Sequence, residues 1–240
     1  MSRDTRLKQG PLSGFPIGLL VLDTRHRLVL GNLQNAGTFP FPILYHVVQG
    51  VSGAELMSGN PSAAEPIIAG ARSLEKSGVQ LIAGACGSFV NYQQEVAAAV
   101  NIPVVMSILL EVPVWLRSLP PSKKLGIVFA STSSFTHRVR IQCGIEATDR
   151  IVIVGADDIQ AFRPIIEQQD DYDDTELRQA LVNLTRDTLT EHPEIGAWLI
   201  QCSDFPPYSC AIATATGLPV FDMVGLIGRL HSALVPRTWS

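Results

Sequence analysis

The chain lacks the short motifs that mark nucleotide-dependent enzymes and serine hydrolases. It has no GxGxxG or GxxxxGK[ST] loop for a bound nucleotide and no GxSxG turn for a nucleophilic serine. Its five histidines show none of the close spacings of metal-binding motifs. These absences predict a protein without a nucleotide, flavin or other cofactor and without a metal.

Charge and long apolar runs are also scarce. Charged residues make up 17% of the chain and the net charge is -4, with no basic stripe to neutralise phosphates, so no nucleic-acid partner is expected. The longest apolar run, residues 102–116, is broken by Glu111 and two prolines, which predicts no membrane span. No apolar signal segment follows the amino-terminal charges and no CxxC pair occurs, so a cytoplasmic protein with reduced thiols is expected.

What the chain does contain is an alternation of short apolar runs with helix-like stretches. This pattern is typical of an α/β fold with parallel strands, which are covered on both faces and therefore read as continuous apolar runs. The expected strands are 17–22, 43–48, 79–85, 102–107, 125–130, 151–155, 197–201 and 219–223. The expected helices are 63–76, 89–100, 174–189, 208–216 and 224–234.

Two stretches of the chain are similar to each other and suggest a duplicated half. AGACGSFVNYQQEVAAAVNIPVV and LIQCSDFPPYSCAIATATGLPVF align without a gap at an offset of 116 residues. The offset pairs two cysteines, two phenylalanines, two tyrosines and two Pro-Val steps: Cys86 with Cys202, Phe89 with Phe205, Tyr92 with Tyr208, Pro103 with Pro219, and Val104 with Val220. We therefore expect two pseudo-symmetric halves, residues 1–121 and 122–240, each a parallel sheet flanked by helices, with the first completed by the carboxyl-terminal segment.

Cys86 and Cys202 are the candidate catalytic residues. Each follows a predicted strand and precedes a helix, at the sheet edge where parallel α/β proteins bind ligands. A helix start favours an anion and is expected to lower the pKa of each thiol. Two such thiols facing one substrate would remove a proton from one face of a carbon and return one to the other. The alternative is that both are core cysteines, which is the role expected for Cys143 and Cys210.

Small polar residues near each thiol are candidates for binding a substrate. Gly87 and Ser88 follow Cys86, and Ser203 and Asp204 follow Cys202, in turns whose N–H groups suit a carboxylate. Two loops at the same predicted edge, 31–42 and 131–138, add further candidates: Asn32, Asn35, Thr38, Ser134 and Thr136. The alternative for the serines and threonines is helix capping.

These features together resemble the aspartate/glutamate/hydantoin racemase superfamily, a group that also includes the Alma-type dimethylsulfoniopropionate lyases. The resemblance runs from LLVLD and GNLQNAGTFPFP through GACGSF and FASTSS to QCSDFPPY and TGLPVFD. It implies two Rossmann-like domains with the active site between them, no cofactor, Cys86 and Cys202 as an acid/base pair, and a homo-oligomer.

One departure from the superfamily puts the substrate in question. Amino-acid racemases of the superfamily commonly have Cys-Asn-Thr after each strand, where this chain has Cys-Gly-Ser and Cys-Ser-Asp. Asp204 is expected to raise the pKa of Cys202, to repel a carboxylate, and to suit a cationic group such as an ammonium or sulfonium.

Three functions follow from the sequence. The first is a cofactor-independent racemase or epimerase acting next to the carboxylate or carbonyl of a small, amino-acid-like molecule. The second is a lyase, by β-elimination of dimethylsulfoniopropionate or by decarboxylation. The third is a non-catalytic protein that binds a small molecule.

Overall fold

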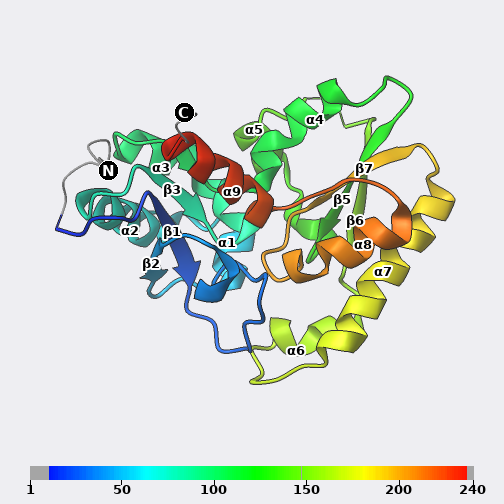
Figure 1. Ribbon diagram of the computed structural model, residues 1–240, viewed down its shortest axis with the longest axis horizontal. Helices are drawn as coiled ribbons and strands as arrows, with labels where there is room; N and C mark the ends of the chain where they lie inside the picture. Colours follow the sequence, from blue (N-terminus) through cyan, green and yellow to red (C-terminus); the bar gives the residue numbers. More distant parts are fainter. Residues whose placement is uncertain (1–10, 147, 237–240) are drawn as a thin grey trace, which may run out of the picture.

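Two four-stranded sheets, both entirely parallel, make up the strands of the described structure. The computed structural model describes residues 11–146 and 148–236 (Figure 1). The sheets have equivalent strand orders, β2-β1-β3-β4 and β6-β5-β7-β8. The strands are β1 (Ile17–Leu22), β2 (Ile43–Val48), β3 (Leu81–Gly84), β4 (Val104–Val105), β5 (Lys124–Phe129), β6 (Ile151–Gly155), β7 (Ile195–Ile200) and β8 (Val220–Phe221). The predicted α/β fold with two pseudo-symmetric halves is confirmed.

Helices flank both sheets. They are α1 (Gly53–Ser58), α2 (Ala64–Lys76), α3 (Gln93–Ala99), α4 (Val112–Ser118), α5 (His137–Gln142), α6 (Arg163–Ile166), α7 (Asp174–Glu191), α8 (Ser209–Thr216) and α9 (Met223–Leu234). Four of these, α1, α4, α5 and α6, are shorter than two turns, and of these α1 and α6 were not predicted. A signal for α1 was present, because Ser52 and Glu55 form a capping box at its start.

Three predicted strands are shorter than expected, and proline explains two of them. Strands β4 and β8 begin just after Pro103 and Pro219, which have no N–H to donate to a neighbouring strand. Both proline carbonyls still accept a hydrogen bond from the adjacent strand, from Ile82 at 3.0 Å and from Trp198 at 2.8 Å. The third, β3, spans four residues where seven were expected.

One hydrophobic cluster joins the two halves. It combines residues of β1 and β3, such as Leu19 and Ala83, with residues of β5 and β7, such as Ile127 and Leu199. Each half has a second cluster of its own, around Phe89 in the first and Trp198 in the second. The shared cluster holds the carboxyl ends of the two sheets near each other.

Each half also extends its last helix onto the other half. Helix α4 lies beside the second sheet, where the Trp115 ring stacks on Phe221 of β8 at 3.6 Å between centroids. Helix α9 lies beside the first sheet, where His231 stacks on Phe41 at 3.7 Å (Figure 1). The expected boundary between residues 121 and 122 falls in the connection from α4 to β5.

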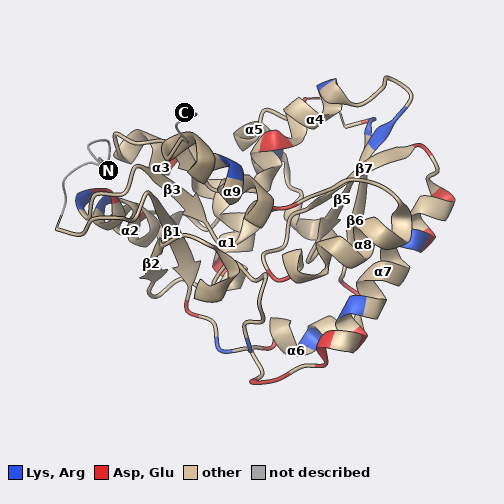
Figure 2. Ribbon diagram, viewed as in Figure 1, with Lys and Arg blue, Asp and Glu red and all other residues tan. Residues whose placement is uncertain are grey.

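Within the described residues, no helix has both the length and the apolar character needed to cross a membrane. Helix α7, at the rim of the second half, carries both Arg residues and Asp or Glu residues (Figure 2).

Candidate active site

Cys86 lies two residues after the end of β3 and is the N-cap of a short 3-10 helix. This helix, η3 (Gly87–Tyr92), is buried along its whole length. The Phe89 N–H donates to the Cys86 carbonyl at 3.0 Å, and Ser88 is 5% exposed. The Cys86 thiol is therefore held in a rigid turn between β3 and α3. We call residues 86–92 the Cys86 loop.

Cys202 occupies the equivalent position after β7, and a carboxylate lies next to it. Its Sγ is 3.8 Å from Asp204 Oδ2. The other carboxylate oxygen, Oδ1, is 3.0 Å from His26 Nε2 and accepts a hydrogen bond from the Asn32 amide at 2.7 Å. A chain of contacts thus runs from the thiol through Asp204 to an imidazole of the other half. We call residues 202–208 the Cys202 loop.

The two loops meet where the halves meet. A Cβ built on Gly87 would lie 2.1 Å from Gln201 Nε2 and 2.6 Å from the Gln201 carbonyl oxygen. Residue 87 must therefore be glycine, because the backbone after Cys86 packs directly against the residue before Cys202. The structure brings both predicted thiols to one interface at the carboxyl ends of the strands.

Each loop is covered by a segment of the opposite half. The Arg138 side chain of α5 donates to the Asn91 carbonyl of the Cys86 loop at 2.8 and 3.0 Å. On the other side, Gly31 lies against the Cys202 loop, so that a Cβ at Gly31 would be 2.9 Å from Pro207 Cα. The site is therefore assembled from both halves, two segments from each.

Burial raises the pKa of both thiols, and the predicted lowering by a helix start is wrong. For Cys86, burial is the main cause and the Asp204 charge adds to it, while hydrogen bonding from Ser88 acts in the opposite direction. For Cys202, burial, the Asp204 charge and the neighbouring Cys86 place the pKa well above its usual value. The 3-10 turns after the cysteines are too short and too buried to offset desolvation. The predicted direction of the Asp204 effect on the pKa of Cys202 is supported.

Other predicted site residues are engaged within their own loops. The Asn35 side chain caps a 3-10 turn by accepting from Gly37 N–H, and donates to the Leu28 carbonyl at 2.8 Å. The Thr38 hydroxyl donates to the Asn32 carbonyl at 2.7 Å and accepts from the Gly31 N–H. Both brace the 31–38 loop. Ser134 is buried and ends a 3-10 turn that two residues separate from α5, and Ser203 is half-buried beside Cys202.

The other two cysteines differ from each other. Cys143 is buried in the shared cluster, and burial raises its pKa to about 12, as befits a core cysteine. Cys210 is exposed on α8, so it is not a core cysteine. Within residues 11–146 and 148–236, no three His, Cys, Asp or Glu side chains are grouped to hold a metal ion.

His26 is the site residue that sequence reasoning missed. It lies 178 positions from Asp204 and belongs to no repeat or spaced motif. Its side chain is only 3% exposed. Burial alone would lower its pKa, but the hydrogen bond and negative charge of Asp204 prevail, and the net shift is upward. A basic side chain of the first half thus lies against Asp204, at the place where a cationic group was expected.

Comparison with known proteins supports this reading of the fold. Over 229 residues the chain is 29% identical to dimethylsulfoniopropionate lyase 6 of Emiliania huxleyi (strain CCMP1516). The match covers 91% of the chain and 60% of that relative, so the chain spans less than two thirds of the relative's length. It is 28% identical over 215 residues to the dimethylsulfoniopropionate lyase of Durusdinium sp. clade D, covering 87% of the chain and 71% of the relative. No protein-family model matches.

Solved structures with this fold have other activities in their names. An aspartate racemase homologue from Pyrococcus horikoshii OT3 matches with a TM-score of 0.54 and 15% identity, over 92% of this chain and 99% of the other. Unliganded arylmalonate decarboxylase matches with a TM-score of 0.56 and 13% identity, over 94% of each chain. These findings support the resemblance to the aspartate/glutamate/hydantoin racemase superfamily: the sequence is similar to lyases, and the fold is shared by racemases and a decarboxylase.

Proposed function

We propose that the protein is a lyase that removes a proton from the carbon next to a carboxylate and expels a leaving group from the following carbon. The observation that carries the proposal is the unequal surroundings of the two thiols. Asp204 lies 3.8 Å from Cys202, whereas Ser88 has the equivalent place beside Cys86. A racemase uses each thiol as base in one direction and as acid in the other, so similar surroundings suit it. An elimination requires a single base.

Dimethylsulfoniopropionate is the substrate to test first, since sequence relatives that match about nine-tenths of the chain are named as lyases of it. In the proposed step the Cys86 thiolate takes a proton from the α-carbon. The C–H electron pair forms the new double bond, and the C–S bond breaks with its electrons going to sulfur. The products are acrylate, dimethyl sulfide and a proton on Cys86, which then passes to water.

Cys86 is assigned as the base because Ser88 favours its thiolate. Hydrogen bonding from the Ser88 backbone and hydroxyl lowers the pKa of Cys86 against the effect of burial. Cys202 has the opposite bias, because the Asp204 carboxylate disfavours a second negative charge next to it. Cys202 therefore rests as a thiol, and in the proposed reaction it donates a hydrogen bond to the carbanion-like intermediate.

A racemase or epimerase is the second candidate. The repeat favours it, because Cys86 and Cys202 occupy matched positions at the ends of β3 and β7. In that reaction Cys86 would take the proton from one face and Cys202 would return one to the other.

Proton NMR in D₂O separates the two candidates. We expect dimethylsulfoniopropionate to give the vinylic signals of acrylate together with dimethyl sulfide, and the Cys86→Ser variant to give neither. Loss of the α-proton signal of an amino acid or hydantoin, with inversion and no new product, would replace the lyase by the racemase. If the protein leaves every compound of this panel unchanged, the proposed function is wrong for these substrates.

A further inference from the structure

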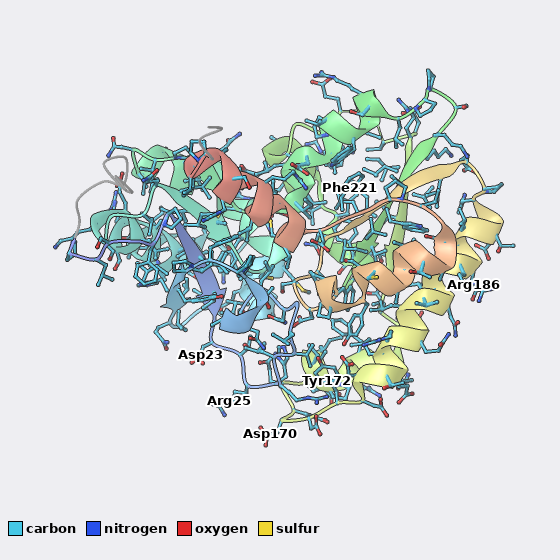
Figure 3. The ribbon with its side chains drawn as sticks, in the orientation of Figure 1. Asp23, Arg25, Asp170, Tyr172, Arg186 and Phe221 are labelled. Carbon is cyan, nitrogen blue, oxygen red and sulfur yellow. The ribbon has the colours of Figure 1, made fainter. Side chains whose placement is uncertain are left out.

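The segment that follows β1 crosses from the first half to the second and is held there by hydrogen bonds and an ion pair. We call residues 23–30 the β1 loop. The Arg25 N–H donates to Gln168 Oε1 at 3.0 Å, and Arg27 donates to the Tyr172 carbonyl at 2.9 Å. Arg27 also pairs with Asp171 at 3.0 Å and lies 5.2 Å from the centre of the Tyr172 ring. Figures 2 and 3 show this loop beside the acidic segment that follows α6.

Gln168 adopts a backbone conformation that usually belongs to glycine. Its φ is 56°, and among the described residues no other non-glycine residue has a positive φ. It follows the last turn of α6, where the Gln169 N–H closes a capping bond to the Pro164 carbonyl at 2.9 Å. A side chain at this position costs conformational free energy. The side chain present is the one that accepts the hydrogen bond from Arg25.

The β1 loop carries His26 to the Cys202 loop. The ring donates from Nε2 to Asp204 Oδ1 at 3.0 Å, and its buried Nδ1 has no partner among the described residues. After Asp204, the second side chain that raises the pKa of the ring is Gln168, which also accepts the hydrogen bond from Arg25 of the β1 loop. The Asp204 carboxylate in turn faces Cys202, and its charge also raises the pKa of Cys86 and of Tyr172.

We propose that His26 is a positioning residue that sets the acid strength of Cys202 through Asp204. The imidazolium turns one carboxylate oxygen away from the thiol and offsets the negative charge of the other. The contact of the β1 loop with Gln168 and Tyr172 keeps the ring in place. This inference rests on the proposed function only in taking Cys202 as a group that acts on the substrate.

The sign of the effect follows from the charges. The hydrogen bond and charge of Asp204 raise the pKa of His26 above 6.5 despite burial, so at pH 6.5 most of the rings carry a proton. Removing that positive charge leaves the Asp204 charge uncompensated, which raises the pKa of Cys202 further and lowers its thiolate fraction. Removing the Asp204 charge has the opposite effect.

The test is the rate at which iodoacetamide alkylates each cysteine at pH 6.5, the ordinary pKa of histidine, followed by peptide mass spectrometry. We expect His26→Gln to slow alkylation of Cys202 by about three- to tenfold, an order-of-magnitude figure for one partly screened charge. Asp204→Asn should accelerate it. In the Asp204→Asn background, His26→Gln should have no further effect, because a buried imidazole without its carboxylate is neutral.

Two controls separate this effect from a loss of structure. Exposed Cys210 is in every sample and should react at the same rate in all variants. The matched variant is His192→Gln, which breaks a second histidine–carboxylate pair, to Glu194 at 3.2 Å, at the opposite end of β7. We expect it to leave the Cys202 rate unchanged.

Gln168→Gly tests the loop contact and the Gln168 contact with the His26 ring, while leaving His26, Asp204 and Cys202 unchanged. Glycine relieves the positive φ, so the urea midpoint should stay the same or rise, while Cys202 alkylation should slow as it does in His26→Gln. Equal slowing by His26→Gln with and without Asp204 would overturn the inference, as would no slowing at all. If His26→Gln does not fold, Gln168→Gly alone and in the Asp204→Asn background decides in the same way.

The alkylation pattern does not depend on a substrate. If it holds in a protein that cleaves no dimethylsulfoniopropionate, the inference stands and the proposed function fails. If the lyase activity is found without the pattern, the inference fails and the proposed function stands.

Discussion

The Cys86 and Cys202 loops are copies in sequence, but they are charged differently. Both end a buried strand, both place a buried phenylalanine and tyrosine at the same spacing, and both are covered by a segment of the other half. Over the Cys86 loop, the Arg138 guanidinium binds a carbonyl and the Glu95 carboxylate, away from the thiol. Over the Cys202 loop, His26 binds a carboxylate that itself contacts the thiol.

A single aligned position accounts for the difference. Ser88 and Asp204 are equivalent in the repeat, one neutral and one acidic. The duplicated fold places two thiols together, and the change at this position disfavours the thiolate less at Cys86 than at Cys202. The following predictions test that difference at matched positions of the two loops.

The largest difference is expected in catalysis. We predict that Cys86→Ser lowers kcat for the elimination by about 10³-fold or more and that Cys202→Ser lowers it by about 10-fold, because loss of a general base typically costs 10²–10⁴. Both are measured as acrylate formation under saturating substrate, with circular dichroism to confirm folding. Equal losses in the two variants would point instead to a two-base racemase.

The next difference concerns stability at the residue after each cysteine. Gly87→Ala would place a methyl group within 2.6 Å of the Gln201 carbonyl, and we expect it to destabilise the protein by about 2–3 kcal/mol. Ser203→Ala, at the equivalent position, should change the free energy of unfolding by less than about 0.5 kcal/mol. Urea unfolding measures both. A tolerated alanine at position 87 would mean that the two loops do not pack as described.

The paired tyrosines, Tyr92 and Tyr208, should differ by a smaller amount in their contributions to the free energy of unfolding. The Tyr208 hydroxyl donates to the Asp174 carboxylate at 2.8 Å, whereas the Tyr92 hydroxyl donates to the Asn60 carbonyl at 2.7 Å. A bond to a charged acceptor is the stronger, so we expect Tyr208→Phe to cost about 2 kcal/mol and Tyr92→Phe about 1 kcal/mol in urea unfolding. The reverse order would contradict this ranking.

The smallest effect is a pH dependence of stability at the Cys202 loop. The folded-state pKa of His26 is raised, so its pair with Asp204 stabilises the protein fully below pH 6.5 and less as pH rises through the folded-state pKa. The urea midpoint of the wild type should fall relative to that of His26→Gln as the pH rises above 6.5. Parallel curves for the two proteins would show that the pair adds no pH-dependent stability.

Most of the framework was predictable from the sequence, because buried parallel strands leave continuous apolar runs. Strands β1, β2 and β6 have the predicted bounds, and the repeat located both thiols. The ionisation of the thiols was not predictable, since it depends chiefly on burial. The contact of His26 with Asp204 was not predictable either, because tertiary folding alone brings the two residues together. The roles of Asn35 and Thr38 were also hidden, because a polar loop residue that braces its own loop has the same sequence pattern as one that binds a ligand.

The unequal ionisation of the two thiols is the central claim, and one sample of wild-type protein tests it. Alkylation of Cys86 and Cys202 is followed together across a pH series, with exposed Cys210 as the internal standard. We expect Cys86 to react with an apparent pKa below that of Cys202, because Ser88 favours its thiolate and Asp204 disfavours that of its partner. Equal apparent pKa values, or a lower one for Cys202, would contradict the account.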